Sequence, residues 1–313
     1  MDASLAASDR KATTKTLYRI LATNHLIPAP FGAIRLDRLR PTDIEALVLR
    51  MRTATRVREG AKVRAFADST IRSVYTVARA ALDGAVRDGL LATNPAAAMK
   101  RPGVERKEAR FLSGDEMRSL LDAASASRYH RALVLISQTG ARRGEILALR
   151  WDDVDLAAKN IRIRGTLARV DGQLTITEPK TDRSRRTVPL SPLALSALTE
   201  QRTSQAAERL HARNEWTPTK YVFTTAIGQP VDPRNLLRVV KSAATKTSLT
   251  NVGVHSLRHS AAVALLEGGI NIKAVSDLLG HSSIAITGDI YGHTTDDAAR
   301  AAVSLLSIAW GSQ

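Results

Sequence analysis

Strand-like sequence occurs in one short stretch of this 313-residue chain, and apolar residues at helical spacing dominate the rest. The stretch contains IRIR at 161–164, LTIT at 174–177 and TVPL at 187–190, which predict three short strands of one antiparallel sheet. On both sides of it, apolar residues recur every three or four positions, as on the buried face of a helix. We therefore expect a mainly α protein, with a helical N-terminal domain and a mixed α/β domain built around a small antiparallel sheet.

The first hundred residues predict a small helical bundle. Residues 12–26 carry a helix-like apolar stripe, Pro41 and Asp43 suit the first turn of a second helix, and residues 68–88 have the spacing of a long third helix. Residues 54–68, rich in arginine and alanine, are expected to form a loop. Residues 1–100 are therefore expected to form one domain with basic outer faces.

A basic segment without apolar periodicity follows this bundle. KRPGVERKEAR at 100–110 contains five Lys or Arg residues. We expect residues 101–110 to be a linker, and its charge suits a segment that lies on phosphates. A plain solvated linker is the alternative reading.

Residues 111–313 are expected to form the second domain. Ser113 and Glu116 have the spacing of a capping box, and HRALVLIS at 130–137 predicts a buried helix that ends at a Thr-Gly turn. Ser191-Pro192 and Asp232-Pro233 are typical helix starts. The chain ends in AARAAVSLLSIAW at 298–310, which predicts an apolar tail helix.

The charge of the chain indicates its partner. The formal net charge is +16 and the pI is about 10.7, which points to a polyanion such as nucleic acid. There is no cysteine, so disulfides and cysteine-based metal sites are excluded. No apolar run approaches the length of a membrane span and the N-terminus lacks a signal-peptide pattern, so we expect a cytoplasmic, nucleoid-associated protein without membrane contact.

Four short sequence words carry the residues suited to chemistry: TGARRGE at 139–145, HSLRHS at 255–260, LGHSS at 279–283 and TGDIYGH at 287–293. Arginine cannot act as a base, but its planar fork binds phosphate with two hydrogen bonds. Tyrosine is a poor nucleophile unless positive charge and a base lie near it. Together these residues point to a phosphodiester that is attacked by Tyr291.

These words resemble the tyrosine recombinases, the phage integrase family, and the resemblance extends from about Thr16 to about Leu306. The family pattern is Arg, Lys, His-x-x-Arg, His or Trp, then Tyr, in that chain order. Its catalytic residues fall on Arg142, Lys180, His255, Arg258, His281 and Tyr291. Six positions matched in order make a specific signal, whereas any one word would be weak.

The resemblance implies a role for each of these residues. Arg142 and Arg258 would hold the non-bridging oxygens of one phosphate, although Arg143 stands beside Arg142 and the residues alone do not say which points inward. His255 would accept the proton of Tyr291.

The remaining members of the pattern lie in shorter words. His281 would donate a hydrogen bond to a phosphate oxygen, and Lys180, in a turn between two strands, would protonate the departing 5′-oxygen. Glu145 is placed to orient Arg142, or is an ordinary surface carboxylate.

Two histidines of the HSLRHS segment also raise the question of a metal site. His255 and His259 have the spacing of a helical zinc pair, but Ser256 stands where metalloproteases place a glutamate. We therefore expect no metal and no other cofactor, and assign His259 to packing or to the surface.

The resemblance predicts a site-specific DNA recombinase or integrase of the kind found on mobile genetic elements, which cleaves and rejoins DNA through a 3′-phosphotyrosyl intermediate. Residues 1–100 would be a core-binding, SAM-like DNA-binding domain, and residues 111–313 the catalytic domain, whose tail helix docks on a neighbouring subunit. Partners would be double-stranded DNA, further copies of the chain in a synaptic tetramer, and in some systems accessory DNA-bending proteins. A type IB topoisomerase and a catalytically silent DNA-binding regulator are the alternatives. Too few residues precede the first expected helix for an arm-binding domain, so the chain is of the simpler type or is trimmed.

Basic residues outside the catalytic pattern are candidates for contacts with the DNA backbone. They occur on the long N-terminal helix, in the linker and around the turn that carries Lys180, and they are Arg72, Arg79, Lys100, Arg101, Arg106, Lys107, Arg183, Arg185 and Arg186.

Overall fold

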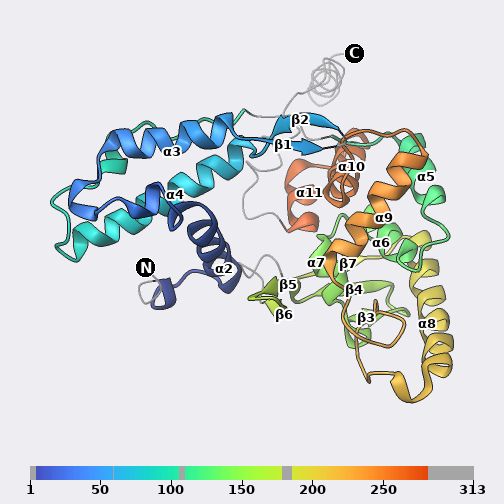
Figure 1. Cartoon of the computed structure of the whole chain (residues 1–313). Coiled ribbons are helices and arrows are strands. Elements are labelled where there is room, and N and C mark those ends of the chain that lie inside the picture. The colour runs from blue at the N-terminus through green and yellow to red at the C-terminus, as the bar shows by residue number, and fades with distance from the viewer. Residues whose placement is uncertain (1–4, 59, 106–109, 178–184, 281–313) are drawn as a thin grey trace, which may run out of the picture. The chain divides into compact units, whose positions relative to one another are not determined.

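A computed structural model describes residues 5–58, 60–105, 110–177 and 185–280. The chain divides into two compact units, Met1–Lys107 and Glu108–Gln313, each of which is described by itself (Figure 1). The division falls inside the segment for which the sequence predicted a linker.

In its described residues the first unit is built on three longer helices, α2 (Ala12–Leu21), α3 (Pro41–Thr53) and α4 (Asp68–Arg87). A π-helical turn, Ala22–Leu26, extends α2. At the start of α3, the Asp43 carboxylate accepts a 2.8 Å hydrogen bond from the backbone N–H of Arg40, which satisfies a donor that the helix leaves open. Helices α2, α3 and α4 pack against one another through buried apolar side chains. These include Leu21, Leu47, Val48, Met51, Ile71, Val74 and Val77. The predicted helical bundle is thus present.

The expected loop over 54–68 is wrong. Two exposed strands, β1 (Thr55–Arg58) and β2 (Ala61–Arg64), pair antiparallel there and turn at Gly60, whose φ is +78°. Valine alternates with arginine or lysine in both strands, and every residue of the two strands is exposed except Val63, which is half-buried. Because strand prediction relies on one apolar face, a ribbon that is basic on both sides gives no such signal.

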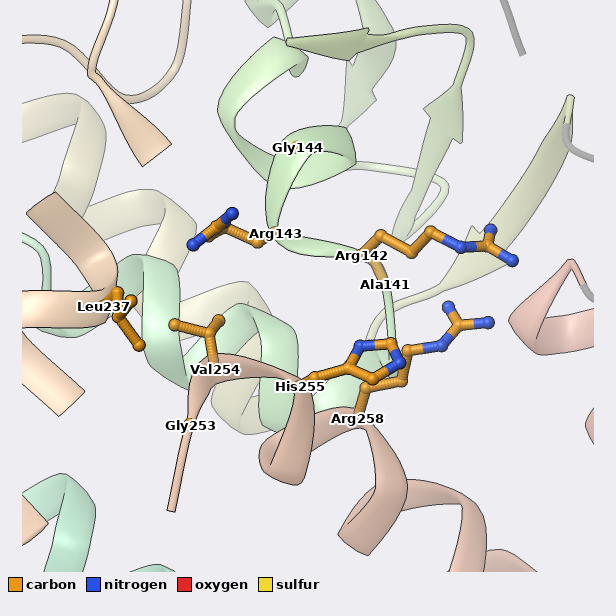
Figure 2. Close-up of a pocket in the computed structure, with 9 residues that line it drawn as sticks. All are labelled: Ala141, Arg142, Arg143, Gly144, Leu237, Gly253, Val254, His255 and Arg258. Carbon is orange, nitrogen blue, oxygen red and sulfur yellow. The ribbon is translucent and has the colours of Figure 1, made fainter. Parts of the chain in front are cut away.

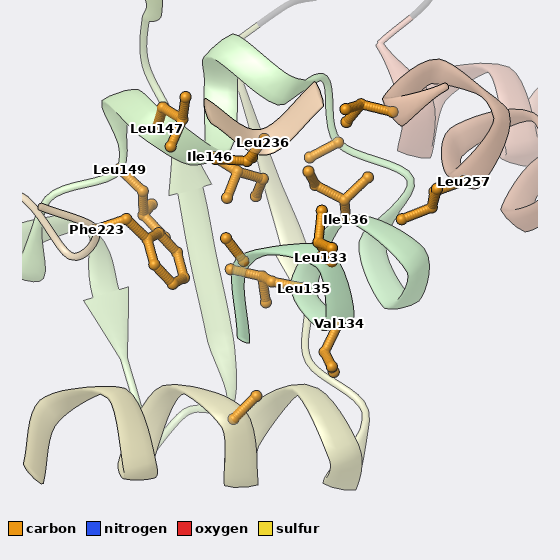
Figure 3. Close-up of a cluster of buried hydrophobic side chains, with 14 of the residues drawn as sticks. Leu133, Val134, Leu135, Ile136, Ile146, Leu147, Leu149, Phe223, Leu236 and Leu257 are labelled. Carbon is orange, nitrogen blue, oxygen red and sulfur yellow. The ribbon is translucent and has the colours of Figure 1, made fainter. Parts of the chain in front are cut away.

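The second unit has seven longer helices within its described residues. They are α5 (Gly114–Ala123), α6 (His130–Thr139), α7 (Arg143–Ala148), α8 (Pro192–Ala212), α9 (Pro233–Lys246), α10 (Val254–Glu267) and α11 (Ile272–Leu279). Helix α6 is the central element: its residues 132–136 are all buried, and it packs against α8 and α10 (Figure 3). This burial explains why its sequence is apolar on nearly every side.

The helix ends of this unit follow the local sequence. Ser113 and Glu116 form the predicted capping box, with hydrogen bonds of 3.2 and 3.0 Å. Ser191 and Asp232 cap α8 and α9 as expected. Helix α11 begins at the cap Asn271 and ends at Gly280, whose φ of +66° is the left-handed conformation that favours glycine.

The predicted single sheet is two sheets. β4 (Asn160–Ile163) lies between β3 (Val154–Asp155) and β7 (Arg186–Pro189), all antiparallel, with Ile161 opposite Val188. β6 (Gln173–Thr177) pairs instead with β5 (Thr166–Val170), a strand the sequence analysis missed. Helix α7 lies so close to β5 that a Cβ on Gly144 would stand 2.6 Å from the Thr166 side chain. The fold class, mainly α with small antiparallel sheets, is confirmed. No helix in the described part of the chain is long and apolar enough to cross a membrane.

Candidate active site

A cavity of about 430 Å³ opens where the turn after α6, the start of α7 and the start of α10 meet (Figure 2). Its lining includes Arg142, Arg143, His255 and Arg258. The guanidinium groups of Arg142 and Arg258 lie close together on one side, and the Arg143 side chain points to the other side (Figure 2). The structure therefore brings together three residues of the recombinase pattern, and it separates Arg142 from its neighbour Arg143.

Arg142 is held at both ends by polar contacts. It is the N-terminal cap of α7, where its backbone N–H donates to Glu145 Oε2 at 2.8 Å. Its Nη1 donates to Glu145 Oε1 at 2.8 Å, and its Nη2 donates to the carbonyl of Gly280 at 3.0 Å. The side chain of Glu145 is only 3% exposed. The contact expected between Glu145 and Arg142 is present, and Glu145 is not a surface carboxylate.

Arg258 is almost wholly buried, with 2% of its surface exposed. It lies on α10 one turn after His255, so both side chains face the cavity. Its Nη1 donates to the carbonyl of Gly140 at 2.7 Å and its Nη2 to the carbonyl of Leu279 at 2.9 Å. A buried guanidinium needs such partners, and they also fix its orientation.

Arg186 was expected to contact DNA phosphate, but the structure places it inside the unit. Its side chain is 7% exposed and forms an ion pair with Glu145, with Nη2 2.9 Å from Oε2. Its Nε donates to the carbonyl of Leu278 at 2.7 Å. The residues alone could not show this, because Arg183, Arg185 and Arg186 are alike in sequence. Only tertiary packing shows that Arg186 is buried.

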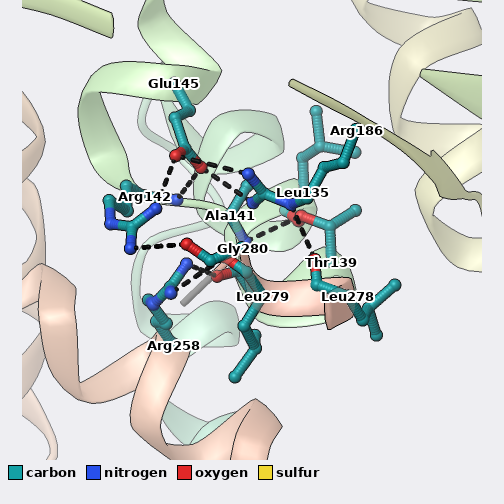
Figure 4. A network of polar contacts seen from close by, with 11 residues as sticks. Leu135, Thr139, Ala141, Arg142, Glu145, Arg186, Arg258, Leu278, Leu279 and Gly280 are labelled. Carbon is teal, nitrogen blue, oxygen red and sulfur yellow. Dashed lines mark hydrogen bonds and ion pairs between the residues drawn. The ribbon is translucent and has the colours of Figure 1, made fainter. Parts of the chain in front are cut away.

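Three consecutive carbonyls at the end of α11 therefore accept hydrogen bonds from three different arginines (Figure 4). The carbonyl of Leu278 accepts a hydrogen bond from Arg186, that of Leu279 from Arg258, and that of Gly280 from Arg142. The C-terminal end of a helix carries unsatisfied carbonyls and partial negative charge, so it attracts cations. The three arginines thus join the end of α11 to the cavity wall.

The charges of this cluster affect the ionisation of Glu145. Burial alone raises the pKa of its carboxyl, but the charge and hydrogen bonds of Arg186, and then those of Arg142, outweigh this effect. The net pKa of Glu145 is lowered, so the group is a carboxylate at neutral pH.

His255 is an uncharged imidazole in this surrounding. Its side chain is exposed at the mouth of the cavity, but enough of the ring is covered for desolvation to be the largest cause of a lowered pKa. Positive charge nearby lowers the pKa further, to about 4, and comes from His259, Arg258, Arg142 and Arg143. His259 stacks edge-on against it, with ring centroids 4.5 Å apart. A neutral imidazole at pH 7 is able to accept a proton.

Several candidate residues lie outside the described residues: Lys180, His281 and Tyr291 of the catalytic pattern, Arg106, Lys107 and Arg183 of the expected DNA contacts, and the tail at 298–310. Of the remaining expected DNA contacts, Arg79, Lys100, Arg101 and Arg185 are exposed. Arg72 is half-buried and donates to the carbonyl of Pro102 at 2.9 Å. In the described ranges no group of three His, Asp or Glu side chains is arranged to hold a metal.

The family model described as "Phage integrase family" matches residues 110–298. Over 246 residues the chain is 33% identical to a "Tyrosine recombinase XerC-like" protein of Caldanaerobacter subterraneus subsp. tengcongensis, covering 72% of this chain and 62% of that protein. It is 34% identical over 221 residues to the tyrosine recombinase XerC of Mycobacterium sp. (strain KMS), covering 67% of each chain. This chain therefore spans less than two thirds of the length of the first of these relatives.

Solved structures share the fold. The Tn1549 transposon integrase in complex with a circular intermediate DNA superposes with a TM-score of 0.77 at 22% identity, covering 96% of this chain and 95% of that one. A lambda integrase dimer bound to a COC′ core site gives a TM-score of 0.66 at 18% identity, covering 94% of this chain and 77% of that one.

Proposed function

Because the chain belongs to the phage integrase family, we propose that it is a tyrosine-type site-specific DNA recombinase that cuts and rejoins duplex DNA without ATP or a metal. The hydroxyl oxygen of Tyr291 attacks the scissile phosphorus and forms a 3′-phosphotyrosyl bond, while the bond from phosphorus to the 5′-oxygen breaks. His255 takes the tyrosine proton, and Lys180 gives a proton to the departing oxygen. The 5′-hydroxyl of a second strand then attacks the phosphotyrosine and reverses these steps, so the bond energy is conserved.

The observation that carries this proposal is the paired guanidinium groups of Arg142 and Arg258 in one cavity (Figure 2). Both are fixed by carbonyls and, for Arg142, by a buried carboxylate. In the transition state the two non-bridging oxygens of the phosphate gain negative charge, and donors fixed beforehand stabilise that charge more than the ground state. This arginine pair supplies what divalent cations supply in two-metal nucleases.

The lowered pKa of His255 supports its role as the proton acceptor. Desolvation, and after it the neighbouring positive charges, keep the ring neutral, with a pKa of about 4. A bound phosphodiester places a negative charge beside the same cations, which raises the proton affinity of the imidazole. The base is therefore unprotonated before DNA binds and becomes stronger when the substrate is in place.

The partners follow from the same proposal. The similar structures include integrases bound to DNA and a lambda integrase tetramer bound to a Holliday junction. We infer duplex DNA as the substrate and a tetramer at synapsis, with the helical unit before residue 101 as a second DNA-binding domain, residues 101–110 as the linker, and the tail helix docked on a neighbouring subunit. We also propose that accessory DNA-bending proteins take part and that the protein is cytoplasmic and associated with the nucleoid.

A trapped covalent adduct tests the proposal. The substrate is a nicked duplex of the DNA that flanks the gene, built so that the short cleaved fragment diffuses away. The wild type should accumulate a protein–DNA adduct, and Tyr291→Phe should bind this DNA with nearly unchanged affinity and form none. An adduct with Tyr291→Phe overturns the assignment of the nucleophile. An adduct-forming wild type that never pairs two sites in a band-shift assay points to a topoisomerase, and a wild type that binds without cleaving points to a regulator.

A further inference from the structure

Arg186 contacts two segments that the proposed mechanism needs, the start of α7 and the end of α11. It begins β7, and Arg185 alone separates it from residues 178–184, which contain Lys180. Its guanidinium pairs with Glu145, which holds Arg142, and it donates to Leu278 at the end of α11, shortly before His281.

A purely structural role is the simpler explanation of such a buried ion pair. Buried pairs are weak evidence for stability, because the loss of hydration offsets much of the attraction, and apolar side chains of similar size often serve equally well. Their specific geometry is harder to replace. The planar fork of arginine here meets a carboxylate and a carbonyl at the same time, which neither lysine nor an apolar residue does.

We propose that Arg186 is a positioning residue for the strand-transfer reaction: through Glu145 it sets the orientation of Arg142, and through the Leu278 carbonyl it fixes the end of α11. This proposal rests on the proposed recombinase function. In this role Arg186 does not touch DNA, whereas the sequence had suggested that it contacts a phosphate.

Single-turnover cleavage of the trapped duplex separates positioning from binding and from folding. Arg186→Met should lower the cleavage rate constant at saturating DNA by roughly 10–100-fold, by analogy with the loss seen when residues that orient metal ligands are removed. The DNA dissociation constant should stay close to that of the wild type, because the buried Arg186 side chain does not touch DNA in this role. Arg186→Lys should give an intermediate rate, because lysine keeps the charge without the fork. Arg162→Met is the matched control: Arg162 is exposed on β4 of the same sheet, and its loss should leave the rate unchanged.

The pH dependence gives a readout that folding alone would not move. The charged groups that face Glu145 in the described part of the unit are Arg186 from β7 and Arg142 from the start of α7. Without Arg186 the pKa of Glu145 rises, since burial is then opposed only by Arg142 and the larger of the two opposing contributions is lost. Arg186→Met should therefore lose activity at a higher pH than the wild type as acid is added. Adding Glu145→Gln should remove that shift, and the two changes together should cost less than the sum of the single ones.

Each other outcome overturns the proposal. If Arg186→Met weakens DNA binding but cleaves at the wild-type rate once saturated, Arg186 contacts phosphate. If it lowers only the amplitude of the reaction, and neither the rate constant nor the pH profile, its role is confined to folding. A wild type that forms no adduct contradicts the recombinase function itself, which is a separate result.

A second inference comes independently from the hairpin β1–β2 of the first unit. Residues directly opposite each other in an antiparallel pair lie on the same face. The register places Arg56 and Arg58 on one face, opposite Val63 and Ala61, and Lys62 and Arg64 on the other. All four cations belong to the exposed class, and Val57 is 71% exposed. The ribbon thus presents positive charge on both faces.

We infer that this hairpin lies in the major groove of the duplex, which also rests on the proposed function. The major groove is about 12 Å wide and admits a two-stranded ribbon. If the ribbon enters with its turn toward the bases, each of its two faces meets one phosphate backbone, so the cations on both faces have partners. Arg64 also pairs with Asp68 at 2.7 Å, which orients its side chain near the start of α4.

The salt dependence of DNA affinity tests this placement. Each phosphate contact contributes about 0.9 to the slope of log affinity against log salt, so Arg56→Gln with Arg58→Gln should lower the slope by about 2. Arg202→Gln with Arg209→Gln on α8 removes the same charge from an exposed surface of the other unit and should change the slope far less. Wild-type protein should also protect guanine N7, which faces the major groove, from dimethyl sulfate, and deleting residues 56–63 should restore methylation.

Two results would contradict it. If the hairpin pair behaves like the control pair, the ribbon does not touch DNA. If the slope falls but guanine protection stays, the ribbon lies on the outside of the backbone. Adduct formation by the wild type is measured in the same samples and reports separately on the recombinase function.

Discussion

Arg142 donates a 3.0 Å hydrogen bond to the carbonyl of Gly280, a residue 138 positions later in the chain. The acceptor is the left-handed end of α11 and the last described residue before His281. A side chain at this position has no room, because a Cβ on Gly280 would stand 2.7 Å from Nη1 of Arg186. The contact therefore depends on a glycine for two reasons, its positive φ and the space that Arg186 fills.

Gly280→Ala should accordingly damage both stability and cleavage. The left-handed conformation costs an alanine roughly 1–2 kcal/mol. Gly269→Ala is the matched control, since its φ is +80° and no atom lies within 4 Å of its Cβ position. Both variants should lower the midpoint of thermal unfolding, but only Gly280→Ala should also slow single-turnover cleavage by about tenfold or more, since it displaces groups that orient Arg142. Equal cleavage by the two variants would mean that the Arg186 contact has no effect on the reaction.

The sequence predicted most helices of this fold because their ends and faces are local features. Ser113, Ser191, Asp232 and Asn271 cap helices through their own side chains, so residue type and spacing are enough to find them. Strand β5 was not predicted because its only fully buried side chain is Leu167, so buried and exposed residues alternate too little along it. The hairpin β1–β2 escaped because neither of its faces is buried.

The candidate site was predictable only in part, for a different reason. Residues of the pattern are found from local words, and Arg142, His255 and Arg258 do line one cavity. The inward turn of Arg186 depends on partners in α7 and α11, which are far apart in the sequence. Among several arginines in one segment, the buried one is recognised only from its tertiary partners.

His255 should make stability depend on pH in a defined window. Its folded pKa is about 4, below the ordinary value of 6.5, so the folded state disfavours the protonated ring. The stability that this neutral ring contributes is complete above pH 6.5 and is lost as pH falls through about 4. His255→Asn cannot titrate, so it should lose less stability than the wild type between pH 7.5 and pH 4.5.

Urea unfolding midpoints at the two pH values measure this difference. The pKa of His259 is also lowered, by burial and then by Arg258, and neither cause is His255, so its own contribution should be similar in the two proteins. Equal losses in the wild type and in His255→Asn would show that His255 is not held neutral by its surroundings.

DNA affinity should fall steeply as salt is added. The chain carries a formal net charge of +16, and contacts with several phosphates release several counterions. A protein with six to ten such contacts loses roughly 10³–10⁵ in affinity between 50 and 200 mM salt.

Adduct formation at saturating DNA should in contrast be unchanged by EDTA. A loss that Mg²⁺ restores would favour a metal-dependent nuclease over the arginine pair.

Lys180 is the subject of the most selective test. If it is the general acid, Lys180→Ala should slow cleavage of ordinary DNA by roughly 10²–10⁴-fold, because the 5′-oxygen is too basic to depart unprotonated at pH 7. Replacing the bridging 5′-oxygen with sulfur gives a leaving group that needs little protonation, so on that substrate Lys180→Ala should approach the wild-type rate. Arg142→Ala is the control and should gain no such rescue, since its expected partners are the non-bridging oxygens. If sulfur rescues neither variant, or both equally, the role of Lys180 is limited to holding the DNA backbone.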